Sequence, residues 1–169
     1  MKNVVLIGMP GAGKSTVGVI LAKVLGYRFI DSDLLIQEQE KCLLKDIIER
    51  DGLEGLLKIE EQVNSEIVAQ ESVIATGGSV IYGAKAMEHL REIGTVVYIQ
   101  LSYKTINNRL DNIKQRGVVF REDQTLKDLY VERCPLYEKY AHITVNAEGL
   151  GMEEVMEKIA TEVAKRDRS

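Results

Sequence analysis

The stretch VVLIGMPGAGKST, residues 4–16, decides the fold class of this chain. It matches every fixed position of the pattern GxxxxGK[ST], in which backbone N–H groups and a helix N-terminus surround phosphate groups. An apolar run precedes the pattern and a segment with helical spacing follows it, as the pattern requires. A glycine-rich turn that happens to contain a lysine is the alternative. We expect a nucleoside triphosphate site formed by Gly11, Ala12, Gly13, Lys14, Ser15 and Thr16.

Two residues of this pattern and two later carboxylates have separate expected roles. Lys14 is expected to reach the β and γ phosphates as a catalytic cation, and the Ser15 hydroxyl to ligate Mg²⁺. Asp31 and Asp33 belong to FIDSD, residues 29–33, at the end of the second expected strand. We expect Asp31 to hold Mg²⁺ through water, and Asp33 to accept or orient the proton of an attacking hydroxyl. A purely structural alternative is that one of the two carboxylates caps the next helix.

Short apolar segments alternate with segments of helical spacing along the whole chain. This alternation predicts an α/β fold of three layers, α/β/α, with a parallel five-stranded sheet and ligands at the carboxyl ends of its strands. The expected strands are 4–7, 27–30, 73–75, 96–101 and 142–145. The expected helices are 15–25, 34–50, 53–70, 83–92, 103–115, 125–140 and 152–165. Since no linker or repeat interrupts them, residues 1–169 are expected to form a single domain.

The composition is that of an average globular protein and excludes several classes of partner. Of the 169 residues, 45% are hydrophobic and 28% are charged, with a formal net charge of −4. The negative charge argues against non-specific binding to nucleic acid or to an anionic membrane, and no apolar run reaches the roughly 20 residues of a transmembrane helix. Cys42 and Cys134 form no CxxC pair, which excludes a zinc ribbon and a disulfide framework. We expect a cytoplasmic protein that acts as a monomer.

Three classes of phosphate-loop protein compete at this point. Guanine-nucleotide switches carry an Asn-Lys-x-Asp motif, which this sequence does not contain. Motor and transport ATPases usually end a long apolar strand in Asp-Glu, whereas the strand at 96–101 ends in Gln100 and Leu101. A small-metabolite kinase needs a phosphate loop, an acceptor pocket and a lid, for which this length suffices. The sequence therefore favours an ATP-dependent phosphotransferase that acts on a small hydroxylated metabolite.

Four segments carry a resemblance to a known family: GMPGAGKST at 8–16, FIDSD at 29–33, VIATGGSV at 73–80 and ERCPLYEKYA at 132–141. In this order and spacing they resemble the motifs of shikimate kinases, and the resemblance covers essentially the whole chain. It implies the P-loop nucleoside-monophosphate-kinase-like fold. It also implies transfer of the γ-phosphate of ATP to a ring hydroxyl of shikimate, which gives ADP and shikimate 3-phosphate.

The resemblance also implies an acceptor site. Asp33 would contact the acceptor hydroxyls and act as the base, while the backbone at Gly77 and Gly78 would approach the acceptor closely. Arg133 would bind the acceptor carboxylate, a role for which the planar guanidinium group is suited. A tight turn is the alternative for the glycine pair, and a surface position is the alternative for the arginine.

A lid is expected at about 115–124, where QRGVVFREDQ combines two arginines with a glycine. By resemblance, Arg116 in this lid would approach the transferring phosphate as a catalytic residue. Arg109 would lie near the adenine. A solvated connector is the alternative for the segment.

The helices expected to line the acceptor pocket, at about 34–70, depart from the family pattern. That pattern reads roughly Gly-Glu-x-x-Phe-Arg-x-x-Glu, and its arginine grips the shikimate carboxylate. Aligning on Gly52 and Glu60 puts Leu57 at the arginine position. Lys58 comes one residue later and would project about 100° around the helix. Losing one bidentate arginine from a partly buried carboxylate site costs about 2–5 kcal/mol of binding.

Two further departures concern the glycine turn and the lid. Ser79 replaces the third glycine of a Gly-Gly-Gly turn, and RGVV at 116–119 replaces Arg-Pro-Leu-Leu. The altered acceptor half leaves two alternatives to a shikimate kinase. One is a kinase of the same fold for a different small hydroxyl compound, less anionic or bearing an amine that Glu60 would meet. The other is a pseudokinase that binds nucleotide without transferring phosphate.

Overall fold

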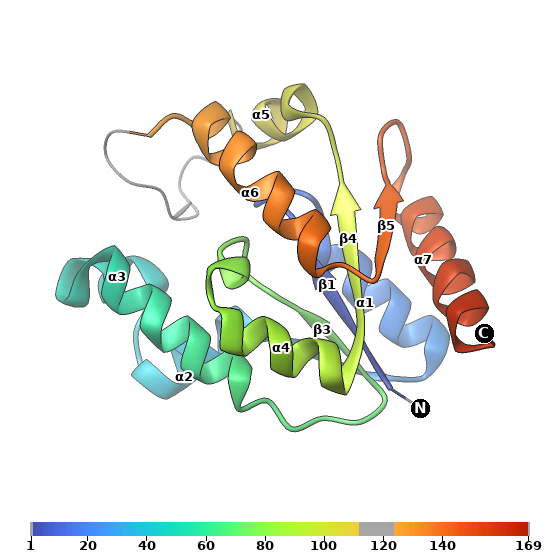
Figure 1. The fold of residues 1–169 in the computed structure, drawn as a ribbon, viewed down its shortest axis with the longest axis horizontal. Helices are drawn as coiled ribbons and strands as arrows, with labels where there is room; N and C mark the ends of the chain where they lie inside the picture. The colour runs from blue at the N-terminus through green and yellow to red at the C-terminus, as the bar shows by residue number, and fades with distance from the viewer. Residues whose placement is uncertain (1, 112–123, 169) are drawn as a thin grey trace.

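The computed structural model describes residues 2–111 and 124–168, and its centre is one parallel β-sheet (Figure 1). The sheet has the order β2-β3-β1-β4-β5, and every pair of neighbouring strands runs parallel. The strands are β1 Asn3–Ile7, β2 Arg28–Asp31, β3 Ser72–Ala75, β4 Gly94–Gln100 and β5 Ile143–Asn146. The inner strands β1 and β3 are buried at every position, which explains the apolar runs 4–7 and 73–75.

Helices cover both faces of the sheet. In Figure 1, α4 and α6 lie in front of the strands, whereas α1 lies behind them and packs against α7. The described helices are α1 Lys14–Leu25, α2 Ser32–Glu40, α3 Leu44–Ser65, the 3-10 turn η1 Val80–Tyr82, α4 Ala84–Ile93, α5 Tyr103–Asp111, α6 Leu126–Tyr140 and α7 Met152–Asp167. The predicted three-layer α/β/α fold with a parallel five-stranded sheet is therefore confirmed. None of these helices is long and apolar enough to span a bilayer.

Two hydrophobic clusters stabilise this arrangement. The larger one fills the space between the sheet and its two helix layers. A smaller one joins α2 to α3 and has four fully or nearly fully buried members: Ile36, Ile47, Leu56 and Val63. Burying one such side chain contributes about 1.5–3 kcal/mol. The α2–α3 pair is thus held as a packed unit beside the carboxyl ends of the strands.

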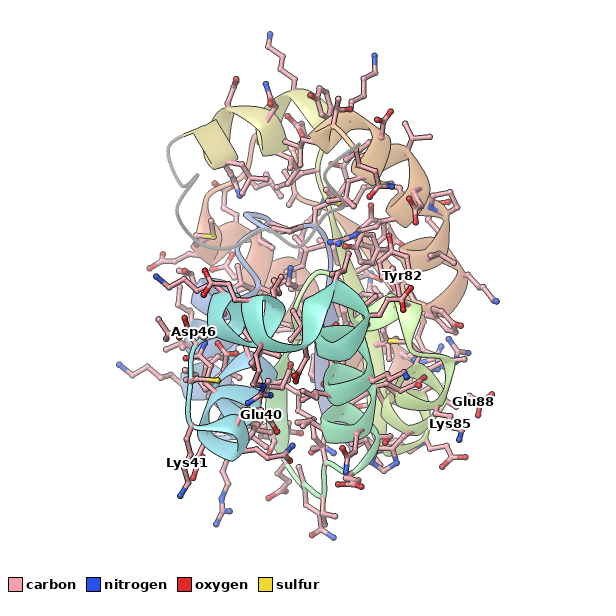
Figure 2. The ribbon with its side chains drawn as sticks, turned by 90° about the vertical axis from the view of Figure 1, so that its left-hand side faces the viewer. Glu40, Lys41, Asp46, Tyr82, Lys85 and Glu88 are labelled. Atoms are coloured by element: carbon pink, nitrogen blue, oxygen red, sulfur yellow. The ribbon has the colours of Figure 1, made fainter. Side chains whose placement is uncertain are left out.

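The α2–α3 region differs from the sequence prediction. The expected continuous helix 34–50 is wrong, because the chain breaks after Glu40, where Lys41 has a left-handed conformation with φ 57°. This turn folds α2 against α3, so that Ile36 and Ile47 enter the same cluster. In a straight helix the two residues would lie on the same face but about 16 Å apart. The expected boundary near residue 52 appears instead as a kink within α3, where Gly52 has φ 76° and ψ 174°. Figure 2 looks onto this pair of helices, with Glu40 and Lys41 labelled at the turn.

One helix end also differs from the prediction. The predicted helix 53–70 ends early, since α3 stops at Ser65. The described part of the predicted helix 103–115 is α5, which extends through Asp111. The predicted lid at 115–124 lies outside the described residues except for Gln124.

The strand order indicates that a ligand would bind at the carboxyl ends of the strands. The chain builds β2 and β3 on one side of β1, and β4 and β5 on the other. In such sheets ligands bind at the carboxyl ends of the strands, where the order reverses. The loops after β1, β2 and β3 all emerge at this edge, so the sequence motifs that they carry are brought together.

Candidate active site

The phosphate loop follows β1 directly. Residues 8–13 curl between the strand and α1, and three glycines, Gly8, Gly11 and Gly13, adopt positive φ angles of 152°, 81° and 96°. Gly13 is the N-cap of α1, so the unpaired N–H groups of the first helical turn lie at the loop. The strand–loop–helix context predicted for the motif is therefore present. The residues predicted to bind nucleotide lie in this loop and in the first turn of α1: Gly11, Ala12, Gly13, Lys14, Ser15 and Thr16.

Lys14 places its ammonium group inside the loop. Its Nζ atom donates hydrogen bonds to the carbonyl oxygens of Gly8, at 2.6 Å, and Met9, at 2.9 Å. The residue is only 8% exposed. Burial lowers the pKa of Lys14 to about 8, while the nearby carboxylate of Asp33 acts in the opposite direction. A buried cation is thus held where the motif brings phosphates.

Asp31 joins the end of β2 to the phosphate loop. The Ser15 hydroxyl donates to Asp31 Oδ2 at 3.2 Å, and Asp31 Oδ1 accepts the backbone N–H of Asp33 at 2.9 Å. The second contact caps the N-terminus of α2, as the structural alternative predicts, and the role of Asp31 in holding Mg²⁺ stays a prediction.

The Ser15–Asp31 pair also fits a magnesium ion. Mg²⁺ prefers oxygen ligands and is commonly bound by one or two carboxylates together with substrate phosphates and waters. A hydroxyl and a carboxylate oxygen meet this requirement beside the phosphate loop. Among the described residues, no group of three His, Cys, Asp or Glu side chains could hold a metal ion on its own. A metal at this position would therefore depend on the phosphates of a bound nucleotide.

Asp33, in the first turn of α2, directs a carboxylate oxygen toward Gly77, which follows β3. Within the described part of the chain, its Oδ1 atom is buried and has no hydrogen-bond partner. A Cβ atom added to Gly77 would lie 2.7 Å from the same oxygen, so the glycine backbone and the carboxylate face each other closely. Burial raises the pKa of Asp33, as does the charge of Asp31, whereas Lys14 lowers it. A buried, unpaired carboxylate oxygen next to a lysine is suited to receive a hydroxyl group.

Arg133 approaches the same region from α6. It is 2% exposed, and a Cβ atom added to Gly78 would lie 3.0 Å from its Nη1 atom. The Gly78 carbonyl accepts a hydrogen bond of 2.6 Å from the Tyr137 hydroxyl, which ties the glycine turn to α6. The arginine predicted to bind a carboxylate is therefore a buried residue beside the predicted glycine pair, and not a surface residue.

Tyr82 holds Arg133 in this position. The Arg133 Nε group donates to the Tyr82 hydroxyl at 3.3 Å, and the guanidinium carbon lies 5.3 Å from the centre of the tyrosine ring. The same hydroxyl donates to Glu132 at 3.0 Å. Figure 2 shows Tyr82 beside α3 and below α6. Sequence reasoning missed this residue, because it lies in a short 3-10 turn without a motif.

Glu60 on α3 and Ser79, which follows the glycine pair, form a buried hydrogen-bonded pair. The Ser79 Oγ atom lies 2.6 Å and 2.9 Å from the two carboxyl oxygens of Glu60. Both residues are 4% exposed. Burial raises the pKa of Glu60 to about 7, against the effect of the Ser79 hydrogen bond. The sequence showed that Glu60 is retained and that Ser79 replaces a glycine, but not that the two residues contact each other.

Comparisons with known proteins identify a family. A family model described as shikimate kinase matches residues 10–164. The chain belongs to the shikimate kinase family. It is 36% identical over 167 residues to a shikimate kinase of a Sulfurihydrogenibium species, an alignment that covers 98% of this chain and 100% of that protein. It is 37% identical over 165 residues to the shikimate kinase of Thermodesulfovibrio yellowstonii, with 96% and 95% covered.

Solved structures from the shikimate kinase family have the same fold. The shikimate kinase from Acinetobacter baumannii, solved in complex with shikimate, superposes with a TM-score of 0.90 at 33% identity and covers 98% of this chain and 94% of that one. The shikimate kinase from Aquifex aeolicus gives a TM-score of 0.82 at 31% identity, with 98% of each chain covered. The nucleoside-monophosphate-kinase-like architecture predicted by resemblance is thereby confirmed.

The family resemblance placed an arginine at position 57, where this chain has leucine. Leu57 is half-buried on α3, one helical turn before Glu60 and on the same side of the helix. Leu56 points elsewhere, because it is fully buried in the α2–α3 cluster. Lys58 is exposed, so in this structure its ammonium group does not take the position of the missing guanidinium. Near Glu60, α3 therefore carries less positive charge than the family pattern would give it.

The two arginines predicted on the nucleotide side have different outcomes. Arg109, on α5, lies against the phosphate loop and donates from Nη1 to the Gly11 carbonyl at 3.0 Å. It is thus next to the predicted nucleotide site, and its contact with adenine stays a prediction. Arg116, predicted as a catalytic lid residue, lies outside the described residues.

Proposed function

We propose that this protein transfers the γ-phosphate of ATP to a ring hydroxyl of shikimate, which gives ADP and shikimate 3-phosphate. The observation that carries the proposal is the buried, unpaired Asp33 Oδ1 atom, which faces Gly77 beside the phosphate-loop Lys14. Membership in the shikimate kinase family supports shikimate as the acceptor over a different hydroxyl compound. The intact set of Lys14, Ser15, Asp31 and Asp33 argues against a pseudokinase.

The phosphate loop and Lys14 would bind and orient the triphosphate. Backbone N–H groups of the loop and of the first turn of α1 stabilise negative charge on the β and γ phosphates. Lys14 would leave its two carbonyl partners and neutralise charge as the γ-phosphate transfers. Ser15 and Asp31 would hold Mg²⁺, which we propose as the cofactor and which would supply further charge neutralisation during the transfer.

Asp33 would act on the attacking hydroxyl. The hydroxyl oxygen forms a bond to the γ-phosphorus, the bond from that phosphorus to the bridging oxygen breaks, and ADP leaves. The proton of the hydroxyl passes to the Asp33 carboxylate. Burial supports this role, because it raises the pKa of Asp33 and so strengthens the carboxylate as a proton acceptor.

The acceptor would lie between Asp33, the glycine turn and Arg133. We propose that Arg133 binds the shikimate carboxylate, and that Gly77 and Gly78 give the ring close access to the backbone. The solved relative from Acinetobacter baumannii, which is titled as a complex with shikimate, supports an acceptor of this kind in this fold. Since Leu57 supplies no charge, we expect a weaker hold on the carboxylate than two arginines would give.

The domain organisation, the oligomeric state and the cellular location are part of the same proposal. We propose a single domain that acts as a monomer in the cytoplasm, on the basis of the continuous sheet, the net charge of −4 and the two unpaired cysteines. Arg116 and the segment 115–124 would form the lid over the transferring phosphate.

An acceptor panel tests the proposed function. The purified protein is incubated with ATP and Mg²⁺ and with shikimate, a cyclic polyol without a carboxylate, or an amino alcohol, and products are identified by ³¹P NMR. We expect one phosphomonoester from shikimate and slower or no product from the other two. Efficient phosphorylation of the polyol or the amino alcohol without turnover of shikimate would show that a different acceptor is used.

A further inference from the structure

The Glu60 carboxyl group is held by a neutral partner. Among the residues that the structure describes, Ser79 alone hydrogen bonds this side chain, through one hydroxyl within reach of both carboxyl oxygens. The residue at i−3 on the same helix face is Leu57, which carries no charge. In this chain, then, neither the adjacent turn of α3 nor the glycine turn supplies a cation that forms an ion pair with Glu60.

Several charged groups from other elements face Glu60. Asp33 on α2 raises the pKa of Glu60, while Arg133 on α6 and Lys14 of the phosphate loop lower it. These groups line the region in which the acceptor is proposed to bind. The charge on Glu60 therefore changes the electrostatic potential at the same place where Arg133 would meet the acceptor carboxylate.

We propose that Glu60, positioned by Ser79, determines the charge of the acceptor pocket and thereby its affinity for a carboxylate-bearing acceptor. With a proton on Glu60, the pocket offers the positive charge of Arg133 to the acceptor. Without that proton, a second carboxylate opposes the acceptor carboxylate in a pocket that has Leu57 in place of a cation. The inference rests on the proposed function and specifies how this site admits its anionic substrate.

The direction of the pH dependence follows from the burial of Glu60. Because burial raises its pKa to about 7, Glu60 is largely protonated at pH 6 and largely ionised at pH 8. If the protonated form alone binds the acceptor, linkage gives an increase of about tenfold in Kd between these two pH values. Binding would also draw a proton onto Glu60, because the acceptor carboxylate stabilises the neutral form.

Ser79 adjusts the pKa of Glu60 and thereby the pH at which the acceptor is lost. Its hydrogen bond lowers the pKa of Glu60, so that it partly offsets the effect of burial. Removing the hydroxyl raises the pKa further and moves the loss of affinity to higher pH. A residue that only supported the fold would not shift a titration midpoint in this way.

The test is calorimetric titration of the full chain with shikimate, without nucleotide, from pH 5.5 to 8. Wild type is expected to show the tenfold rise in Kd, and Glu60→Gln, which keeps the shape and the acceptor for Ser79, is expected to lose it. Ser79→Ala is expected to shift the rise to higher pH. Glu54→Gln, the same change at an exposed position of α3, is the matched control and keeps the wild-type profile. The Glu60 carboxylate raises the pKa of Lys14, so Glu60→Gln would move any effect of Lys14 titration to lower pH and would not flatten the profile.

A second measurement covers the case in which Glu60→Gln does not fold. Titrating wild type with shikimate at pH 7.5 in two buffers of different ionisation enthalpy is expected to reveal uptake of roughly 0.8 proton per shikimate. A pH-independent Kd, no proton uptake, or an unchanged profile in a folded Glu60→Gln protein overturns the inference while leaving the proposed function intact. Absence of shikimate binding at every pH overturns both.

Discussion

The contact between Tyr82 and Arg133 gives a quantitative prediction for acceptor binding. The Arg133–Tyr82 hydrogen bond is long, at 3.3 Å, so its removal in Tyr82→Phe is expected to cost about 1 kcal/mol. This corresponds to a rise of about fivefold in KM for shikimate. Tyr82→Leu also removes the ring 5.3 Å from the guanidinium, and the total of about 2–3 kcal/mol corresponds to about 30- to 150-fold.

Steady-state kinetics at saturating ATP measure this effect. Since Tyr82 acts by orienting Arg133, we expect KM for shikimate to rise in both variants while KM for ATP changes little. Tyr140→Phe is the matched control, because Tyr140 lies on α6 and its ring contacts Lys139. If both Tyr82 variants kept the wild-type KM for shikimate, or if only kcat fell, Arg133 would not depend on Tyr82 as the structure implies.

Three further predictions test other parts of the structure. Leu57→Arg should raise kcat/KM for shikimate by about tenfold or more, since losing a bidentate arginine–carboxylate contact costs about 2–5 kcal/mol. No gain in a folded variant would contradict the assignment of Leu57 to the acceptor pocket. Gly52→Ala should lower the free energy of unfolding in urea by about 1–3 kcal/mol, because φ 76° with ψ 174° suits only glycine, and unchanged stability would refute that reason. Burial lowers the pKa of His142 to about 4, so the unfolded chain binds more protons between pH 4 and 6.5. Its contribution to stability is present above pH 6.5 and is lost toward pH 4, so the thermal midpoint of wild type should fall more steeply there than that of His142→Asn.

The fold could be predicted because its signals are local. The apolar run of β1, the glycine-rich loop and the helical spacing of α1 lie next to each other in sequence, and each restricts the others. The α2–α3 region could not be predicted in the same way. Its break after Glu40 depends on Ile36 and Ile47 meeting in one cluster, which is a tertiary contact that no local propensity encodes.

Residues of the site could be predicted only where they belong to a recognisable sequence motif. Lys14, Ser15 and the two aspartates follow from the phosphate loop and from the end of β2. Tyr82 and the Ser79–Glu60 pair have no such signal, because they are defined by contacts between segments 19 to 51 residues apart. The sequence identified Leu57 as a departure, and the structure adds that Lys58 is exposed.

The most direct test of the central claim compares shikimate 3-phosphate formation by wild type and Asp33→Asn. The account predicts that kcat falls by about 10²- to 10⁴-fold, the range typical of a positioned general base, while binding of ADP is unchanged. Glu38→Gln makes the same chemical change at an exposed position of α2 and should keep the wild-type rate. A folded Asp33→Asn protein that forms shikimate 3-phosphate at the wild-type rate would contradict the account.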